Sequence, residues 1–426
     1  MAKYSDAYKG VRDFYPEDER IQRYIFSVMQ KTVESFGYEP YNASILEPTE
    51  LYTTKTSEEI IKEQTYTFKD RGDRSVTLRP EMTPTVARMV AARKRELGYP
   101  LRWYSIPNCF RYERPQKGRL REFWQLNVDL FGADDLAADV EITELAYRIM
   151  RAYGAKEEHF EIKIADRALL ETAFDASNLD KEQREAYRRL LDKKPKMTRE
   201  DFEREAKTIT PNDPLTLIER RDPAVSQARA QVDAVLETLT ARGMSNVSFD
   251  PSIVRGFNYY SGVVFELFDV SGEDTGSQFG GGRRSLFGGG RYDYLVEEYG
   301  GEHVPAVGFG MGDVTIRDFL GKYHLLPKER ATADLYLAPV SSTYIEQANG
   351  VAQFLRDKGI RVALGLKHEK IGDHIKTAIK LGIPCFMAYG ENETRAGMVT
   401  IKNLVGEEER TIPLEQAPRT IQEMVE

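Results

Sequence analysis

The chain of 426 residues is long enough for roughly two or three domains, and it contains no apolar run near the roughly 20 residues that a membrane helix needs. Its net charge of −8 argues against non-specific nucleic-acid binding over the whole surface, so any RNA site must be a local patch. Cys109 and Cys385 are its only cysteines and its start resembles neither a signal peptide nor a transit peptide, so we expect a cytoplasmic protein without disulfides and without a metal site built from side chains.

The first hundred residues predict a helix, a hairpin and a second helix. Residues 17–37 repeat apolar side chains at helical spacing, and residues 66–79 alternate like a hairpin. Thr83 suits the N-cap of the second helix, with Pro84 in the first helical position. Capping alone explains Thr83, but it does not explain the carboxylate of Glu81.

Residues 107–132 predict two strands joined by a basic loop. Arg111 and Glu113 share one face of the first strand because side chains alternate along a strand. On the return strand, alternate residues form a mainly polar row: Phe123, Gln125, Asn127 and Asp129. The residues between them form an apolar row on the opposite face. Burying such a polar row inside a large protein costs free energy unless its polar groups form hydrogen bonds, and a polar ligand on the sheet would supply the partners. The loop cations suit phosphate; a solvated hairpin with a charged turn is the alternative.

The middle of the chain predicts further helices. Residues 134–153 have helical periodicity, and residues 160–164 predict a short strand. Residues 167–245 are highly charged and mostly helical, which predicts an inserted helical module. Their charge is typical of a solvated surface, and no motif in them assigns a function.

Three stretches that contain glycine follow. Residues 253–266 end as a strand, and Arg255 beside Gly256 places a guanidinium where the backbone can approach a ligand closely. Residues 271–292 contain two FGGGR units, which lack the GK[ST] of a phosphate-binding loop. Residues 305–320 predict a strand that leads into a helix.

The last hundred residues predict a separate domain. A charged linker near residues 326–332 precedes an alternating βαβα pattern, which predicts a small parallel or mixed sheet. Three acidic residues between 356 and 380 are outnumbered by seven basic ones: Arg356, Lys358, Arg361, Lys367, Lys370, Lys376 and Lys380. This patch predicts local RNA contact; a solvated helix face is the alternative.

The segment FRYERPQKGRLREFWQ, residues 110–125, resembles motif 2 of class II aminoacyl-tRNA synthetases in the form typical of the histidyl-tRNA synthetase family. The resemblance implies ATP as a substrate, held on an antiparallel sheet with Mg²⁺ on its phosphates. Arg111 would bind the α-phosphate and the amino-acid carboxylate, and Arg119 the outer phosphates. Glu113 and Phe123 would contact the adenine. Contacts with tRNA are implied for the loop side chains Arg114, Gln116 and Lys117.

Two further segments resemble the same family. LRPEMT, residues 78–83, resembles a segment in which an acidic residue and a threonine, here Glu81 and Thr83, receive the α-amino group of the substrate. RGFNYYSGVVFE, residues 255–266, resembles the histidine-specific signature, with Asn258 in place of a more common aspartate. Arg255 would then be catalytic together with Arg111, both at the α-phosphate. The imidazole pocket is implied to contain Tyr259, Tyr260, Gln125 and Asp129.

Motifs 1 and 3 match less well. Residues 38–47 predict a strand and residues 51–64 a polar helix, and by resemblance they are the motif 1 region, which implies a homodimer. Ser44 stands where the family usually has proline. In the motif 3 region, Thr315 stands where the family normally has an arginine that stacks on adenine and meets the γ-phosphate. Arg317 is a doubtful substitute because two residues along a helix turn a side chain by about 200°.

We therefore predict an α+β fold. A class II synthetase-like antiparallel core, residues 1–166 and 246–325, contains a helical insertion at 167–245 and precedes an α/β anticodon-binding-like domain at 331–426. The predicted enzyme is an aminoacyl-tRNA ligase that converts histidine and ATP to histidyl-adenylate and transfers the histidyl group to tRNA(His). The alternative is a catalytically inactive, synthetase-like regulatory subunit of histidine biosynthesis. Thr315 favours that alternative; the C-terminal domain, which such a subunit lacks, opposes it.

Overall fold

The computed structural model describes residues 7–53, 64–113, 119–194, 197–253, 259–270, 284–327, 331–367 and 370–425. The chain divides into two compact units, Met1–Leu326 and Pro327–Glu426. In the portion of the chain so described, no helix is long and apolar enough to cross a membrane.

The first unit is built on a nine-stranded sheet of the order β1-β5-β7-β12-β11-β10-β8-β9, with β6 paired to β7. All its pairings are antiparallel except the two outermost, β1 with β5 and β8 with β9. The predicted antiparallel core is therefore confirmed. Its strands are β1 Glu39–Pro40, β5 Leu101–Ser105, β6 Asn108–Phe110, β7 Glu122–Phe131, β8 Phe160–Asp166, β9 Val247–Phe249, β10 Val263–Asp269, β11 Ser285–Arg291 and β12 Ala306–Gly312.

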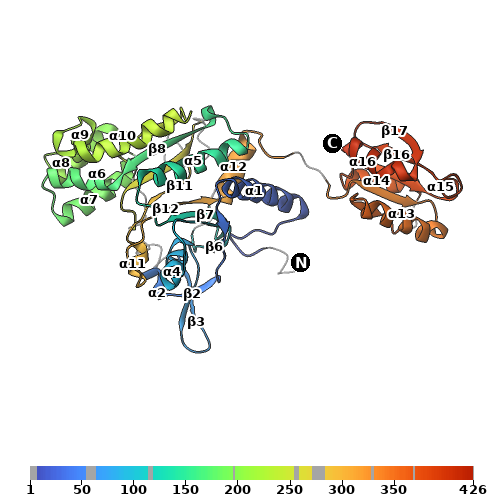
Figure 1. The fold of residues 1–426 in the computed structure, drawn as a ribbon, viewed down its shortest axis with the longest axis horizontal. Helices are drawn as coiled ribbons and strands as arrows, with labels where there is room; N and C mark the ends of the chain where they lie inside the picture. Colours follow the sequence, from blue (N-terminus) through green and yellow to red (C-terminus); the bar gives the residue numbers. More distant parts are fainter. Residues whose placement is uncertain are drawn as a thin grey trace. The chain divides into compact units, whose positions relative to one another are not determined.

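One face of this sheet is covered by long helices. The even-numbered residues Leu126, Val128 and Leu130 of β7 are buried in the main hydrophobic cluster with side chains from these helices, as strand alternation requires. Figure 1 shows the helices on one side of β7. They are α1 Pro16–Ser35, α5 Leu136–Ala152, α10 Ser226–Ala241 and α12 Asp313–Lys322.

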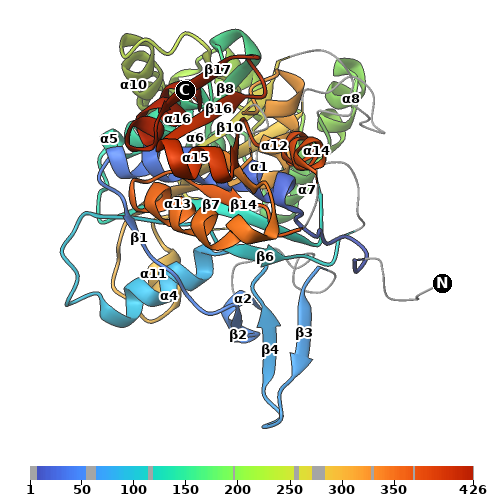
Figure 2. The same cartoon turned by 90° about the vertical axis from the view of Figure 1, so that its right-hand side faces the viewer.

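The other face carries smaller elements and leaves room for a site. Helices α4 Thr83–Arg93 and α11 Leu295–Glu298 lie on this side (Figure 2), near a small sheet of the order β2-β4-β3. That sheet contains the predicted hairpin, and its elements are β2 Leu46–Pro48, β3 Tyr66–Lys69 and β4 Ser75–Leu78. Helix α2 Glu50–Thr53 follows β2 in the chain.

The predicted N-cap of α4 is wrong by one residue. Met82 is the N-cap and Thr83 is the first residue of the helix. Pro84 therefore occupies the second helical position, which tolerates proline as well as the first because neither N–H would have an intrahelical acceptor. Capping consequently does not account for Thr83.

The charged segment 167–245 is helical, as predicted. Three of its helices begin at side-chain caps, since Asp166, Asp180 and Thr198 each accept a hydrogen bond from a backbone N–H of the first turn. Their apolar faces belong to the same hydrophobic cluster as the sheet. The helices are α6 Arg167–Ala176, α7 Lys181–Lys193, α8 Arg199–Ile209, α9 Pro214–Glu219 and α10.

The second unit has a five-stranded mixed sheet of the order β14-β13-β15-β16-β17. Strand β13 pairs in parallel with β14 and β15, and the two later pairings are antiparallel, so the predicted small parallel or mixed sheet is confirmed. Its elements are β13 Leu335–Pro339, α13 Ile345–Asp357, β14 Val362–Leu364, α14 Ile371–Lys380, β15 Cys385–Tyr389, α15 Glu391–Ala396, β16 Met398–Asn403, β17 Glu409–Pro413 and α16 Ala417–Val425.

Candidate active site

A cavity of about 110 Å³ lies on the open face of the large sheet, over the polar row of β7. Its lining residues come from segments far apart in the sequence. Every histidine-binding residue predicted from the sequence that falls in the described ranges lines this one cavity, namely Glu81, Thr83, Arg111, Gln125, Asp129, Tyr259 and Tyr260.

The floor of the cavity is open because glycines stand opposite the polar side chains. In the register of β12 against β7, Gly308 pairs with Asp129. A Cβ atom at Gly308 would lie 2.7 Å from Oδ1 of Asp129, and one at Gly310 would lie 2.3 Å from Nε2 of Gln125. Any larger residue would therefore displace the polar groups that face the cavity.

Asp129 is an acid of the cavity whose pKa is strongly raised. It is buried, the Tyr292 hydroxyl donates a hydrogen bond to its Oδ1, and the Tyr41 hydroxyl lies 3.4 Å from its Oδ2. Burial raises the pKa of Asp129 to about 7, although the two hydroxyls act in the opposite direction. The side chain can therefore change charge near neutral pH.

Glu81 and the paired tyrosines form the side of the cavity next to α4. The Tyr259 hydroxyl donates to Oε2 of Glu81 at 3.3 Å, and both residues are buried. The rings of Tyr259 and Tyr260 lie 4.9 Å apart. This side therefore combines a carboxylate with two aromatic rings, which suits a ligand that has both an ammonium group and a flat polar ring.

The predicted ATP-binding residues lie together at the start of the β6–β7 hairpin. Arg111 Nε donates to the carbonyl of Pro80 at 2.9 Å, and its guanidinium lies 5.4 Å from the ring centroid of Phe123. Arg119 Nη1 lies 3.4 Å from Oε2 of Glu113. Because Arg111 also lines the cavity, it connects this cluster to the polar floor.

Comparison with known proteins identifies the family. The model for histidyl-tRNA synthetase matches residues 10–314, and the model for an anticodon binding domain matches residues 334–424. The chain belongs to the histidyl-tRNA synthetase family. It is 39% identical over 434 residues to a histidine–tRNA ligase of Leptospira biflexa serovar Patoc, covering 98% of each chain. It is 36% identical over 435 residues to that of Halobacterium salinarum, covering 97% of each.

A solved structure has the same fold. The crystal structure of histidyl-tRNA synthetase from Nostoc sp. PCC 7120 superposes with a TM-score of 0.80, covering 99% of this chain and 100% of that chain, at 21% sequence identity. At this identity the likeness is one of fold, and it extends over both units of the chain.

Several predicted residues of the histidyl-tRNA synthetase site lie outside the described residues. Arg255 and Asn258 fall in the range 254–258, and the first FGGGR unit falls in 271–283. The loop residues Arg114, Gln116 and Lys117 fall in 114–118. Their roles stay predictions.

The structure shows where the two residues of the motif 3 region, Thr315 and Arg317, lie. Thr315 Oγ1 donates to the carbonyl of Leu286 at 3.0 Å, which fixes it between α12 and β11. Arg317 forms an ion pair with Asp18 of α1, on the face of the sheet opposite the cavity. Arg317 is therefore not positioned to replace the usual arginine of this motif.

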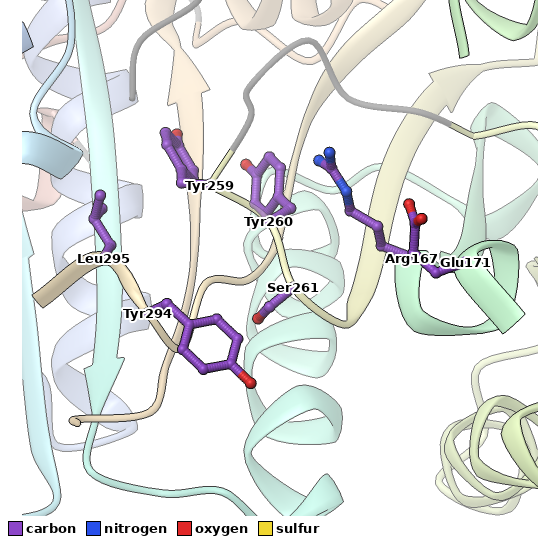
Figure 3. Close-up of a pocket in the computed structure, with 7 residues that line it drawn as sticks. All are labelled: Arg167, Glu171, Tyr259, Tyr260, Ser261, Tyr294 and Leu295. Carbon is purple, nitrogen blue, oxygen red and sulfur yellow. The ribbon is translucent and has the colours of Figure 1, made fainter. Parts of the chain in front are cut away.

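A second, larger cavity of about 280 Å³ shares the paired tyrosines with the first. Figure 3 shows Arg167 and Glu171 extending from α6 beside Tyr260, with Tyr294 on another side. Burial lowers the pKa of Arg167. Tyr259 and Tyr260 thus separate a cavity over the sheet from one beside the helical segment.

Sequence reasoning missed Tyr41 and Tyr292 as neighbours of Asp129. Tyr292 directly follows β11 and the second FGGGR unit, which carried no assigned role in the sequence. Tyr41 has no signal in the sequence either, because only the pairing of β1 with β5 brings it next to β7. The alternating glycines of β12 could have been found from their period of two, which leaves one face of the strand bare.

Proposed function

We propose that the cavity over β7 is the site where this chain, a histidine–tRNA ligase that uses ATP, forms histidyl-adenylate and transfers the histidyl group to tRNA(His). The observation that carries this proposal is the gathering of Glu81, Arg111, Asp129 and the paired tyrosines around one cavity. These residues come from four separate segments, and together they match an amino acid with an ionised backbone and a polar ring.

In the first step the histidine carboxylate attacks the α-phosphorus of ATP, and pyrophosphate leaves. The carboxylate is already ionised at neutral pH, so the step needs no protein base. Arg111 and Arg255 would neutralise the charge that develops on the α-phosphate oxygens, and preorganised cations of this kind lower the barrier by positioning and by charge stabilisation. Glu81 and Thr83 would hold the α-ammonium group.

The side chain of histidine would be recognised by hydrogen bonds in the deeper part of the cavity. Asp129 and Gln125 offer a carboxylate and an amide beside the glycine floor, and Tyr259 and Tyr260 lie across from them. A site that pairs both ring nitrogens can reject analogues without them by a factor of ~10⁴ or more, because its own buried polar groups are then left unpaired.

ATP would lie next to this pocket, over the hairpin. Phe123 and Glu113 would contact the adenine, and Arg119 the outer phosphates. Among the described residues, no three histidine, cysteine or acidic side chains gather closely enough to hold a metal ion. We therefore propose that Mg²⁺ arrives with the ATP phosphates, which suits an ion that keeps most of its water ligands.

The second unit would bind tRNA through its basic patch. Lys376 and Lys380 lie on α14, where Lys376 also contacts Asp373 at 2.9 Å. Arg361 contributes less positive potential than its charge suggests, since it forms an ion pair with Asp334. The loop residues Arg114, Gln116 and Lys117 would approach the acceptor end of the tRNA.

We also propose that the protein is a cytoplasmic homodimer. The dimer is inferred from the motif 1 region, in which Leu46 exposes 43% of its surface; Phe68, in the neighbouring hairpin, exposes 48%. Two buried free cysteines, Cys109 and Cys385, suit a reducing compartment. Sedimentation of the purified chain over a range of concentrations tests the dimer.

Histidine-dependent exchange of pyrophosphate into ATP, assayed with each amino acid and followed by charging of tRNA(His), tests the enzyme function. We expect exchange with histidine alone, and a loss of at least ~10²–10³-fold in Arg111→Ala and in Arg255→Ala. Near-normal exchange in either variant would contradict its role. The match to an anticodon binding domain favours the ligase over the regulatory subunit, which lacks that domain. If no amino acid supported pyrophosphate exchange, the regulatory subunit would be favoured instead.

A further inference from the structure

Both carboxylate oxygens of Asp129 face a tyrosine hydroxyl. Tyr292, directly after β11, donates to Oδ1, and the Tyr41 hydroxyl lies 3.4 Å from Oδ2. The position of Tyr41 is fixed by the fold, because its backbone N–H donates to the carbonyl of Tyr104 at 2.9 Å and its ring packs 5.7 Å from that of Trp103. The hydroxyl is therefore held beside the acid.

The other groups around Asp129 complete its environment. Its partners in the sheet are Trp103 on β5 and Gly308 on β12, neither of which carries a charge. Gln125 lies on its own strand and is neutral, with Nε2 donating to Asn127 at 2.7 Å. Across the cavity stand the ionisable groups of Glu81, Arg111, Tyr259 and Tyr260. Within the described ranges, the two hydroxyls are the groups that favour the charged form of the acid.

We propose that Tyr41 is a positioning and specificity residue for histidine activation, whose hydroxyl, acting with that of Tyr292, holds Asp129 as a hydrogen-bond acceptor for the substrate imidazole. A hydroxyl that donates to a carboxylate oxygen requires that oxygen to accept. Each oxygen keeps a further lone pair, which can accept from an imidazole N–H. The inference rests on the proposed function, since it assumes that the imidazole is the group that reaches Asp129.

The role of Tyr41 predicts a specific pH dependence. The acid accepts from the imidazole only when it is ionised, and its pKa of about 7 places this change near neutral pH. Removing one donor destabilises the ionised form, so the pKa of Asp129 rises further. The value of kcat/KM for histidine should then fall most at low pH and recover at high pH, because this ratio reports the ionisation of the free enzyme.

The test compares Tyr41→Phe and Tyr292→Phe with the native chain in histidine-dependent ATP–pyrophosphate exchange between about pH 6 and 9. Phenylalanine keeps the ring that packs on Trp103 and removes only the hydroxyl. Dividing the kcat/KM of each variant by that of the native chain cancels the titration of free histidine. We expect Tyr41→Phe to lose roughly five-fold at the low end, the factor for one ordinary hydrogen bond, and to approach the native value at the high end.

Two reference variants separate the possible outcomes. Tyr147→Phe removes a comparable hydroxyl that donates to Glu157 at 2.6 Å, away from the cavity, and should follow the native profile. Asp129→Asn should lose histidine activation at every pH. The KM for ATP at saturating histidine should stay native in Tyr41→Phe, and fluorescence of Trp103, against which Tyr41 packs, reports whether that variant is folded.

A Tyr41→Phe profile that matches those of the native chain and Tyr147→Phe would overturn the inference while Asp129→Asn still loses activity. A loss in Tyr41→Phe that is uniform over pH, or that also raises the KM for ATP, would overturn it too, because it would indicate general distortion. If the native chain exchanges no pyrophosphate with histidine, the proposed function fails, whatever the result for Tyr41.

Discussion

Asp129→Asn should stabilise the first unit of the chain, and the gain should depend on pH. Asp129 is buried, its hydrogen-bond partners and sheet neighbours are neutral, and folding raises its pKa from 3.8 to about 7. Between about pH 4 and 7 the folded chain keeps a proton on this acid that the unfolded chain has released. The free energy of unfolding therefore decreases as pH rises through this window, and the destabilisation is complete above it.

The size of the effect follows from the shift in pKa. Each tenfold change in an ionisation constant corresponds to about 1.4 kcal/mol. A pKa raised from 3.8 to about 7 therefore destabilises the folded state by roughly 4 kcal/mol at pH 8 and by less than about 1 kcal/mol at pH 4. Asparagine carries no charge at either pH, so the variant lacks this loss of stability. Its amide oxygen can still accept from the Tyr292 hydroxyl.

The assay is chemical denaturation at several pH values, followed by tryptophan fluorescence. Both tryptophans of the chain, Trp103 and Trp124, lie in the first unit, so the signal reports that unit and not the second. The quantity to compare is the change with pH in the stability difference between variant and native chain, which removes any constant effect of the substitution. Asp73→Asn, at a side chain that is 91% exposed, is the matched control and should show no such change. Parallel pH profiles for the native chain and Asp129→Asn would refute the reasoning.

Three further predictions concern the substrates. Gly310→Ala should raise the KM for histidine more than ~10-fold while the chain still folds, because the new methyl group would lie 2.3 Å from the movable end of Gln125; histidine titration of the exchange reaction measures this. Arg317→Ala should change the KM for ATP by less than about three-fold, since this arginine pairs on the opposite face of the sheet. Lys376→Glu combined with Lys380→Glu should slow charging of tRNA(His) more at low salt than at high salt, and should leave pyrophosphate exchange unchanged.

Each of these three predictions has a control or a result that would contradict it. Gly350→Ala places a methyl group in open space in the second unit, and it should leave the KM for histidine unchanged. A normal KM in Gly310→Ala would mean that Gln125 does not meet the substrate. A large rise in the KM for ATP in Arg317→Ala would place that arginine at the nucleotide. Exchange activity lost together with charging in the lysine variant would show damage beyond the RNA contact.

The sequence was most informative where two constraints agreed. The polar row of β7 is visible because Gln125 and Asp129 alternate with apolar residues that must face a core. The same residues match a family motif, and the structure brings them to one cavity with Glu81 and Tyr259. Strand alternation fixed the face of the sheet, while the motifs supplied the distant partners that alternation alone cannot give.

What the sequence could not provide are contacts that depend on strand order. Tyr41 reaches Asp129 across β5, and its position in the chain gives no hint of this, because β1 contains only two residues and pairs in parallel. The prediction of where α4 begins was wrong for a local reason. Both Met82 and Thr83 can precede a proline in the first turn, and capping preference alone chose the wrong one.

The design of the pocket explains why a buried acid is held by hydroxyls and not by a cation. An arginine beside Asp129 would lower its pKa and remove most of the instability, but it would also occupy the lone pairs that, in the proposed role of Asp129, accept from the imidazole. Tyr41 and Tyr292 are neutral donors, so they orient the carboxylate without cancelling its charge. The uncancelled charge of the buried carboxylate would then cause both the selectivity for an N–H donor and the loss of stability. A substitution that relieves the instability, such as Asp129→Asn, is therefore expected to weaken recognition of histidine, because it replaces one acceptor oxygen of the carboxylate with an amide donor.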